Sequence, residues 1–450
     1  MWLLPVISRV SSAAARIFYR LTVAGGSVPS TGPVLLVANH PNSLIDPALV
    51  VAVAGRPVRF LAAAPIFDDP TIGWLIKAAG SIPVYRPHED AGSIDKNRQM
   101  FDAVFEELSR GEAVGIFPEG TSHSEPSLVD LKTGAARIAF GTHEQHGCAP
   151  TIVPVGMVPT QKGRYRSKML VVIGDPIEWR DLRERGVEDR EAVRELTDRI
   201  ADGLSRVTLN VAQWEDRALV EAAEAIWAEW QGAGKDPAER VARLGITTQI
   251  LADIRARSEP GDLALIRALR RHVRRLAVLR MLPRDLRVNV GLGESIRWAF
   301  RRALLLPSVG VALIGYVLFR PPNWATAACT KAMAPAEDRL STHKVLLGFI
   351  MHAIWTILLA VIAGIVVSPI VGMGALAGIP LYGVVGLRMR ESWQGAGRDL
   401  RRFYTLRARR GLMDELREED SRLAEGLESV RRRWRGEANE SEEPESRERE

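Results

Sequence analysis

Two side chains near the start of the chain, His40 and Asp46, have the chemistry of an acid–base pair. A neutral imidazole is a suitable general base for a hydroxyl group, and a carboxylate at its other nitrogen fixes the tautomer and stabilises the imidazolium. The two residues are six positions apart, and on a continuous helix that separation turns the side chains about 240° from each other. The pair therefore requires His40 in a turn and Asp46 on the element that follows. A helix-capping turn with a solvated aspartate is the alternative.

The residues before His40 indicate what positions it. Val34–Ala38 has the composition of a buried β-strand, and the next five residues, NHPNS, are typical of a turn that ends a strand and can open a helix. Enzymes with a parallel sheet commonly place their reactive groups at such strand ends. The sequence therefore predicts that His40 emerges at the end of a buried strand.

Three further blocks follow at intervals along the chain. They are Gly80–Arg86 (GSIPVYR), Val114–Ser122 (VGIFPEGTS) and Ile152–Gly156 (IVPVG). In order and approximate spacing, these blocks and Val34–Pro47 resemble the glycerolipid acyltransferase family, which includes lysophosphatidate and glycerol-3-phosphate acyltransferases. The resemblance covers Tyr19 to Trp179.

One departure from the family pattern concerns the spacing of the first block. Most of the family has four residues between the histidine and the aspartate, whereas this chain has five, Pro41 to Ile45. The five-residue form resembles a branch of glycerol-3-phosphate or dihydroxyacetone-phosphate acyltransferases. The departure bears on the acceptor more than on the chemistry.

The resemblance implies that His40 is the base, that Asp46 orients it, and that Arg86, Glu119 and Gly120 form the site for the acceptor phosphate. An arginine grips a phosphate through two parallel hydrogen bonds, glycine permits close backbone approach, and the hydroxyl of Thr121 can donate to an anionic oxygen. A surface arginine and a turn carboxylate are the alternatives for Arg86 and Glu119.

Most of the remaining residues expected to contact substrate have a second interpretation. Lys132 either points toward the phosphate or is solvated, and backbone amides near Asn39 are candidates for stabilising the oxyanion. Apolar Val153 and Val155 either line an acyl passage or belong to a plain buried strand. The expected substrate-binding residues are Asn39, Arg86, Glu119, Gly120, Thr121 and Lys132. Direct acyl transfer needs no metal and no cofactor, and none is expected.

The chain alternates apolar strand-like segments with amphipathic helical ones, which predicts an α/β domain with a mostly parallel sheet flanked by helices. The later composition, rich in Arg, Glu, Ala and Leu, predicts further helices. The expected regions are an interfacial amphipathic helix over residues 1–22, the α/β domain over 23–180, a helical region over 181–301, a membrane-embedded region over 302–390, and a charged helix with a disordered acidic tail over 391–450.

The membrane prediction depends on two apolar stretches. Val345–Leu387 has 43 residues without a formal charge, enough for two crossings at about 20 residues each, and its basic flanks predict a hairpin with both ends in the cytoplasm. Ala303–Phe319 is short for a crossing and is expected to be re-entrant or interfacial. A buried helical core is the alternative for both stretches.

Composition narrows the partners. The formal charge of +6 and pI near 9.5 suit an anionic lipid surface, and no nucleic-acid-binding motif is present. Two cysteines give no disulfide framework or zinc spacing. Arg267, Arg270, Arg271 and Arg274 share one helix face, which is either solvated surface or a contact for phosphates.

The sequence thus predicts a membrane-bound O-acyltransferase on the cytoplasmic side of the cell (inner) membrane. Its donor is expected to be acyl-CoA or acyl-carrier protein, its acceptor a phosphorylated glycerol, and its other partners membrane phospholipids. The alternatives are a lipid-binding or scaffolding protein without turnover and a lipid thioesterase.

Overall fold

The computed structural model describes residues 4–70, 72–85, 93–286, 297, 300, 303, 306–408 and 410–447. The chain divides into two compact units. The first unit comprises Met1–Asn210, Asp236–Gly245 and Thr330–Leu346, and the second comprises Val211–Lys235, Ile246–Cys329 and Leu347–Glu450. Arg86 lies outside the described residues, as does most of 287–305.

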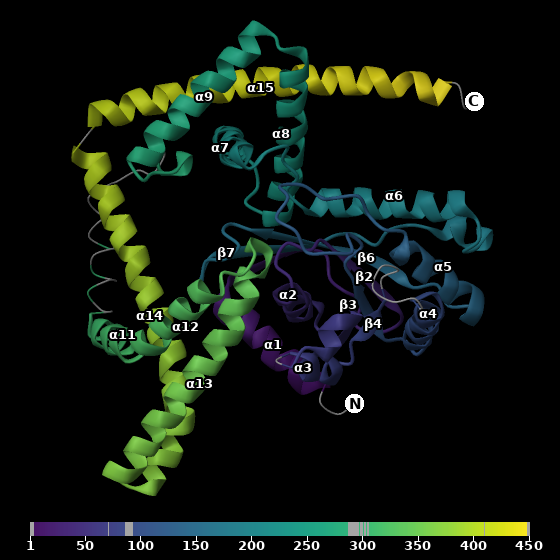
Figure 1. Cartoon of the computed structure of the whole chain (residues 1–450). Helices are drawn as coiled ribbons and strands as arrows, with labels where there is room; N and C mark the ends of the chain where they lie inside the picture. The colour runs from purple at the N-terminus through teal and green to yellow at the C-terminus, as the bar shows by residue number, and fades with distance from the viewer. Residues whose placement is uncertain are drawn as a thin grey trace. The chain divides into compact units, whose positions relative to one another are not determined.

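A seven-stranded sheet forms the centre of the first unit (Figure 1). Its strands are β1 (Arg20–Gly25), β2 (Val34–Ala38), β3 (Val58–Ala63), β4 (Ile82–Val84), β5 (Ala113–Ile116), β6 (Thr151–Pro159) and β7 (Lys168–Ile173). Their spatial order is β1-β7-β6-β2-β5-β3-β4, and neighbours are parallel except for the antiparallel pair β6–β7. The predicted α/β fold with a mostly parallel sheet is confirmed.

Helices cover both faces of this sheet. They are α1 (Leu4–Phe18), α2 (Ile45–Ala54), α3 (Gly73–Ala78), α4 (Ser93–Ser109), α5 (Gly134–His146) and α6 (Arg190–Val207), with 3-10 turns at Ala64–Asp68 and Arg180–Arg185. The N-terminal helix ends at Phe18, and Arg20–Gly25 forms the edge strand β1. The expectation of a helical segment through residue 22 is therefore wrong at its end.

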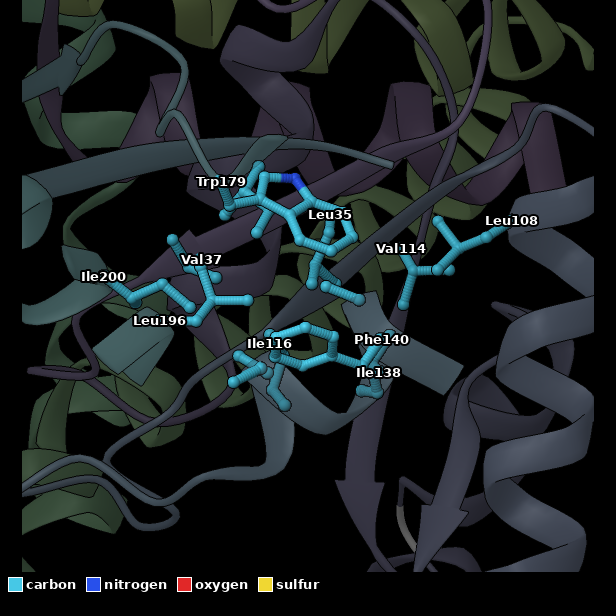
Figure 2. Close-up of a cluster of buried hydrophobic side chains, with 14 of the residues drawn as sticks. Leu35, Val37, Leu108, Val114, Ile116, Ile138, Phe140, Trp179, Leu196 and Ile200 are labelled. Carbon is cyan, nitrogen blue, oxygen red and sulfur yellow. The ribbon is translucent and has the colours of Figure 1, made fainter. Parts of the chain in front are cut away.

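Strand β2 lies inside the sheet, and helices bury both of its faces. Leu35 and Val37 point into one apolar cluster, which Figure 2 shows with side chains from α5, α6 and β5. Val34, Leu36 and Ala38 point into a second cluster on the other face, against α1 and α2. Burial on both faces explains why the strand reads as a continuous apolar run, and it gives the following turn a rigid base.

The remaining described residues are mostly helical. Their helices are α7 (Trp214–Gln231), α8 (Pro237–Arg257), α9 (Pro260–Val278), α11 (Pro307–Leu318), α12 (Arg320–Met333), α13 (Leu340–Val366), α14 (Pro369–Ala408) and α15 (Arg410–Arg447), with 3-10 turns at Pro283–Asp285 and Glu337–Arg339. Helix α15 extends over part of the segment for which the sequence predicts a disordered acidic tail. Side chains beyond residue 436 lie outside the described ones.

Two of these helical segments are long and apolar enough to cross a membrane by length and composition. They are Glu337–Val366 and Pro369–Arg401, and only 11% of the most apolar window of each is buried. Large apolar side chains such as Phe349, Ile365 and Ile370 are mostly exposed. A buried helical core, the alternative for this stretch, would have covered them. The shorter apolar stretch forms α11, whose Val311 carbonyl accepts a hydrogen bond from Tyr382 of α14 (2.9 Å).

Candidate active site

The site begins where the chain leaves β2. The carboxamide of Asn39 bonds to the backbone of Met157 on β6: Nδ2 donates to the carbonyl (3.0 Å), and Oδ1 accepts from the amide (2.7 Å). These two bonds prolong the pairing of β2 with β6 by one residue. They fix the backbone just before His40, and a contact of Asn39 with substrate stays a prediction.

His40 and Asp46 meet as the spacing requires. His40 lies in the turn, Asp46 lies in the first turn of α2, and Nδ1 of the imidazole is 2.9 Å from Oδ2 of the carboxylate. The same oxygen accepts a hydrogen bond from the backbone N–H of Asn42 (2.7 Å). Ser43 completes the turn in the left-handed region, at φ 53°. The extra residue between the pair is thus accommodated within the turn without separating the two side chains.

The surroundings of Asp46 set its charge balance. The residue is fully buried, and burial raises the pKa of its carboxyl, while hydrogen bonds from His40 and Asn42 act in the opposite direction. Its position at the N-terminal end of α2 also favours the anion. Because Nδ1 of His40 is held by Asp46, Nε2 is the nitrogen left to take a proton from a substrate. No hydrogen bond to Nε2 comes from the part of the chain that the structure describes.

Aromatic rings support the imidazole from one side. The ring of His40 stacks on Phe117, with centroids 4.0 Å apart and planes at 10°, and Phe117 in turn stacks on Phe60 at 5.6 Å. The side chain of His40 is 17% exposed. The ring is therefore held in one orientation, and only a small part of it is accessible to a substrate, as a positioned general base requires.

Glu119 holds the backbone of His40. It follows β5, the parallel neighbour of β2, and is nearly fully buried. Oε2 accepts a hydrogen bond from the N–H of His40 (2.7 Å), and Oε1 lies 3.1 Å from Nε2 of His123. The N–H of His123 donates to the carbonyl of His40 (3.2 Å). Both carboxylate oxygens thus contact protein groups, and binding of acceptor by Glu119 stays a prediction.

The loop after Glu119 lies at the surface. Gly120 has φ 75° and is exposed, as is Thr121, whose hydroxyl donates to the Ser122 carbonyl (3.4 Å). A Cβ at Gly120 would lie 3.5 Å from Cγ of Lys132, and the Lys132 N–H donates to the Pro118 carbonyl (2.7 Å). Gly120 and Thr121 directly follow Glu119, and Lys132 lies against Gly120. Contact of these three residues with the acceptor phosphate stays a prediction.

Sequence reasoning missed two residues of this arrangement. His123 directly follows the block Val114–Ser122, and Asn42 lies inside the turn of the first block. The motifs assign functions to other residues of these blocks, so neither residue was predicted to belong to the site. The passage expected at Val153 and Val155 is not lined by them, because both are fully buried in the core. Among the described residues, no group of three or more His, Cys, Asp or Glu side chains is arranged to hold a metal ion.

Comparison with known proteins agrees with this geometry. Residues 20–158 match the model of the Acyltransferase family. Glycerol-3-phosphate O-acyltransferase 1 of Saccharomyces cerevisiae is 28% identical over 289 residues, which are 58% of this chain and 37% of that protein. The 1-acyl-sn-glycerol-3-phosphate acyltransferase of Bacillus subtilis is 28% identical over 169 residues, 37% of this chain and 77% of that protein.

A solved structure, the 1-acyl-sn-glycerophosphate acyltransferase of Thermotoga maritima, is 20% identical with a TM-score of 0.32, covering 45% of this chain and 78% of that one. The chain spans well under half the length of the Saccharomyces protein that it matches. The matched α/β domain contains all four motifs, with the histidine and the aspartate in contact. Residues 20–158 are an acyltransferase domain, which confirms the resemblance to the glycerolipid acyltransferase family drawn from the motifs.

Proposed function

We propose that the chain transfers a fatty acyl group from a thioester donor to a hydroxyl of glycerol-3-phosphate or 1-acylglycerol-3-phosphate. The observation that carries the proposal is the contact of His40 Nδ1 with buried Asp46, which leaves Nε2 as the proton acceptor. The relatives named for these two acceptors support the substrate class. The donor is acyl-CoA or acyl-carrier protein.

In the proposed reaction, Nε2 of His40 takes the proton of the acceptor hydroxyl as its oxygen attacks the thioester carbon. The new C–O bond gives a tetrahedral oxyanion, and the C–S bond then breaks. The imidazolium returns its proton to the departing thiolate, so the enzyme ends unchanged and the products are an ester and a free thiol. Asp46 stabilises the imidazolium in between. No covalent acyl-enzyme is needed, so most of the rate comes from holding both substrates in register.

We further propose that α13 and α14 anchor this enzyme in a membrane. Their length, their apolar composition and their exposed side chains support a hairpin. Lys344 precedes the uncharged stretch, and Arg388 and Arg390 follow it, so the positive-inside rule places both ends in the cytoplasm. An ester of long acyl chains is insoluble in water, and an enzyme at the membrane delivers it there directly.

The test is acyl transfer by the purified full chain. Radiolabelled acyl-CoA or acyl-carrier protein is supplied with a panel of glycerol-3-phosphate, 1-acylglycerol-3-phosphate and other lysolipids. His40→Ala should lower kcat about 10²–10⁴-fold or more, the share of a general base. His146→Ala, an exposed histidine on α5, is the matched control and should leave kcat unchanged.

Three results separate the alternatives. Label in the ester fraction, lost in His40→Ala, supports the transferase. Label released as free fatty acid without any acceptor would identify a thioesterase. No turnover with any donor and acceptor, together with binding of lipid vesicles, would identify a binding or scaffolding protein.

A further inference from the structure

A short segment far from the motifs in sequence, residues 338–342, contacts the turn that carries His40. Thr342 Oγ1 donates to the Asn42 carbonyl (3.2 Å), and Ser341 Oγ is 3.3 Å from Oδ1 of the same asparagine. Asn42 and Ser341 are fully buried, and Thr342 is nearly so. Both hydroxyls belong to the first turn of α13, and the Asn42 turn and this segment lie in the same compact unit.

Ser341 belongs to a buried polar cluster that joins three other parts of this unit. Its Oγ is 2.8 Å from the carbonyl of Lys162, in the turn between β6 and β7, and 3.0 Å from the hydroxyl of Tyr19, just after α1. The Tyr19 hydroxyl donates to the same Lys162 carbonyl. Buried polar groups are costly unless they are hydrogen-bonded. The cluster therefore fixes where the first turn of α13 lies against Asn42.

A second contact joins the same segment to the loop that follows Glu119. The hydroxyl of Ser122 donates to Asp338 Oδ2 (2.5 Å), and Ser122 follows the Glu119 loop directly. Glu119 accepts from the backbone N–H of His40 (2.7 Å). The segment 338–342 is thus bonded both to the turn that contains His40 and to the loop that follows Glu119.

These hydrogen bonds connect Thr342, through Asn42 and Asp46, to the imidazole of His40. Thr342 holds the Asn42 carbonyl, the Asn42 N–H donates to Asp46 Oδ2 (2.7 Å), and that oxygen holds Nδ1 of His40 (2.9 Å). The amide of Asn42 is itself incompletely satisfied, since Nδ2 is buried without a hydrogen-bond partner among the described residues. The carbonyl and the Oδ1 of Asn42 therefore face hydroxyl groups that come from α13 and not from the turn itself.

We propose that Ser341 and Thr342 are positioning residues for His40. Their hydroxyls hold the Asn42 turn, and the turn aligns Asp46 with the imidazole. Because Glu337–Val366 is one of the two segments long and apolar enough to cross a membrane, the inference makes the start of a membrane anchor part of the catalytic arrangement. It rests on the proposed acyl transfer and deepens it.

The test compares two nearly isosteric substitutions on the same helix. Thr342→Val removes the hydroxyl that holds Asn42, and Thr356→Val makes the identical change about four turns further along α13, away from the turn. Thr342→Val should lower kcat about tenfold or more, because a displacement of about 1 Å in a reacting group can cost about a hundredfold. The KM for the acceptor should stay within about twofold, because neither hydroxyl contacts substrate in the proposed reaction.

Thr342→Ser restores a hydroxyl and should recover most of the kcat lost in Thr342→Val. Ser341→Ala should lower kcat in the same direction. A fall in kcat in Thr342→Val that Thr342→Ser does not recover, or a rise in acceptor KM of the same size, would contradict the positioning role. Equal kcat in Thr342→Val and Thr356→Val would overturn it.

A readout without turnover separates this inference from the proposed function. Amide hydrogen exchange is measured by mass spectrometry on the peptide covering residues 39–46, in the full chain in detergent. Exchange should be faster in Thr342→Val than in Thr356→Val, because a turn that Thr342 no longer holds opens more often and exposes its N–H groups to water. If wild type transfers no acyl group, the proposed function fails. Unchanged exchange in Thr342→Val would overturn the coupling of α13 to the turn, whether or not wild type is active.

Discussion

Replacing Asp46 by asparagine isolates the charge of the carboxylate from its geometry. Both hydrogen bonds to this side chain, from His40 Nδ1 and from the Asn42 N–H, reach the same oxygen, Oδ2. Oδ1 is buried without a hydrogen-bond partner among the described residues. The amide oxygen of an asparagine can therefore take the place of Oδ2 and keep both bonds, while its NH2 group takes the place of Oδ1. The tautomer of His40 stays fixed.

The magnitude follows from the separation of the two groups. An imidazolium and a carboxylate 2.9 Å apart attract each other by at most about 6 kcal/mol at an effective dielectric constant of about 20. That energy corresponds to about 10⁴ in rate. The amide oxygen retains part of the attraction through its dipole, so we expect Asp46→Asn to lower kcat about 10²–10³-fold. The acceptor KM should change little.

Asp46→Asn should lower kcat without lowering the free energy of unfolding. Burial raises the pKa of the Asp46 carboxyl, so the ionised group costs folding free energy at pH values above its folded pKa. Asp46→Asn should therefore have a free energy of unfolding at neutral pH equal to or above that of wild type. Asp46→Ala should be less stable, by about 1–3 kcal/mol, because the buried N–H of Asn42 loses its acceptor.

The assay measures kcat, acceptor KM and thermal unfolding for wild type, Asp46→Asn and Asp46→Ala between pH 5 and 8. As the pH falls through the raised pKa of Asp46, the wild-type carboxyl takes up a proton, and the ratio of wild-type to Asp46→Asn kcat should fall toward one. That fall should begin at a higher pH than an ordinary aspartate would give. A stable Asp46→Asn variant with wild-type kcat would refute the role of the charge.

Three further predictions concern other parts of the chain. Arg86→Ala should raise the KM for a phosphorylated acceptor about tenfold or more with little change for the donor; an unchanged acceptor KM would remove Arg86 from the phosphate site. Glu119→Ala should lower kcat more than Glu119→Gln, because only the amide keeps an acceptor for the His40 N–H; equal losses would show that this bond is unimportant. His272→Gln should remove a pH-dependent part of the stability. Burial lowers the pKa of His272, but the carboxylates of Asp420 and Glu419 outweigh it and raise the pKa above 6.5, so the stabilisation is present below about 6.5 and is lost as pH rises through the folded pKa. The difference in Tm between wild type and His272→Gln should shrink from pH 6 to 9, and a constant difference would contradict this account.

The interior strands could be predicted from the sequence because burial on both faces leaves an uninterrupted apolar run, as in β2 and β5. Edge strand β1 could not be predicted in this way. In its sequence, RLTVAG, five of the six residues are exposed or half-buried and only Ala24 is buried, so it shows neither the continuous apolar run of a central strand nor a clean alternation. Its arginine instead matched the pattern of the preceding amphipathic helix.

The chemistry of the site was visible in the sequence where partners are close along the chain. His40 and Asp46 are six residues apart, and the motif blocks gave their neighbours in order. The role of Glu119 as a hydrogen-bond acceptor for the His40 backbone was not visible, because the two residues are 79 positions apart. Only the adjacency of the parallel strands β2 and β5 brings them together. A carboxylate in a motif suggests contact with substrate. Its hydrogen bond to a backbone amide can be recognised only once the fold is known.

The five-residue spacing and the contact with α13 are parts of one arrangement. A turn with one more residue must still bring Asp46 to His40, and it does so with Ser43 in the left-handed region and with the Asn42 N–H directed at Asp46 Oδ2. This conformation leaves the Asn42 carbonyl to be satisfied from outside the turn, and Thr342 supplies the donor. A buried carbonyl without that donor would cost about 1–3 kcal/mol, enough to favour other conformations of the turn. The longer turn is therefore stable in a catalytic geometry because a helix three hundred residues later completes it.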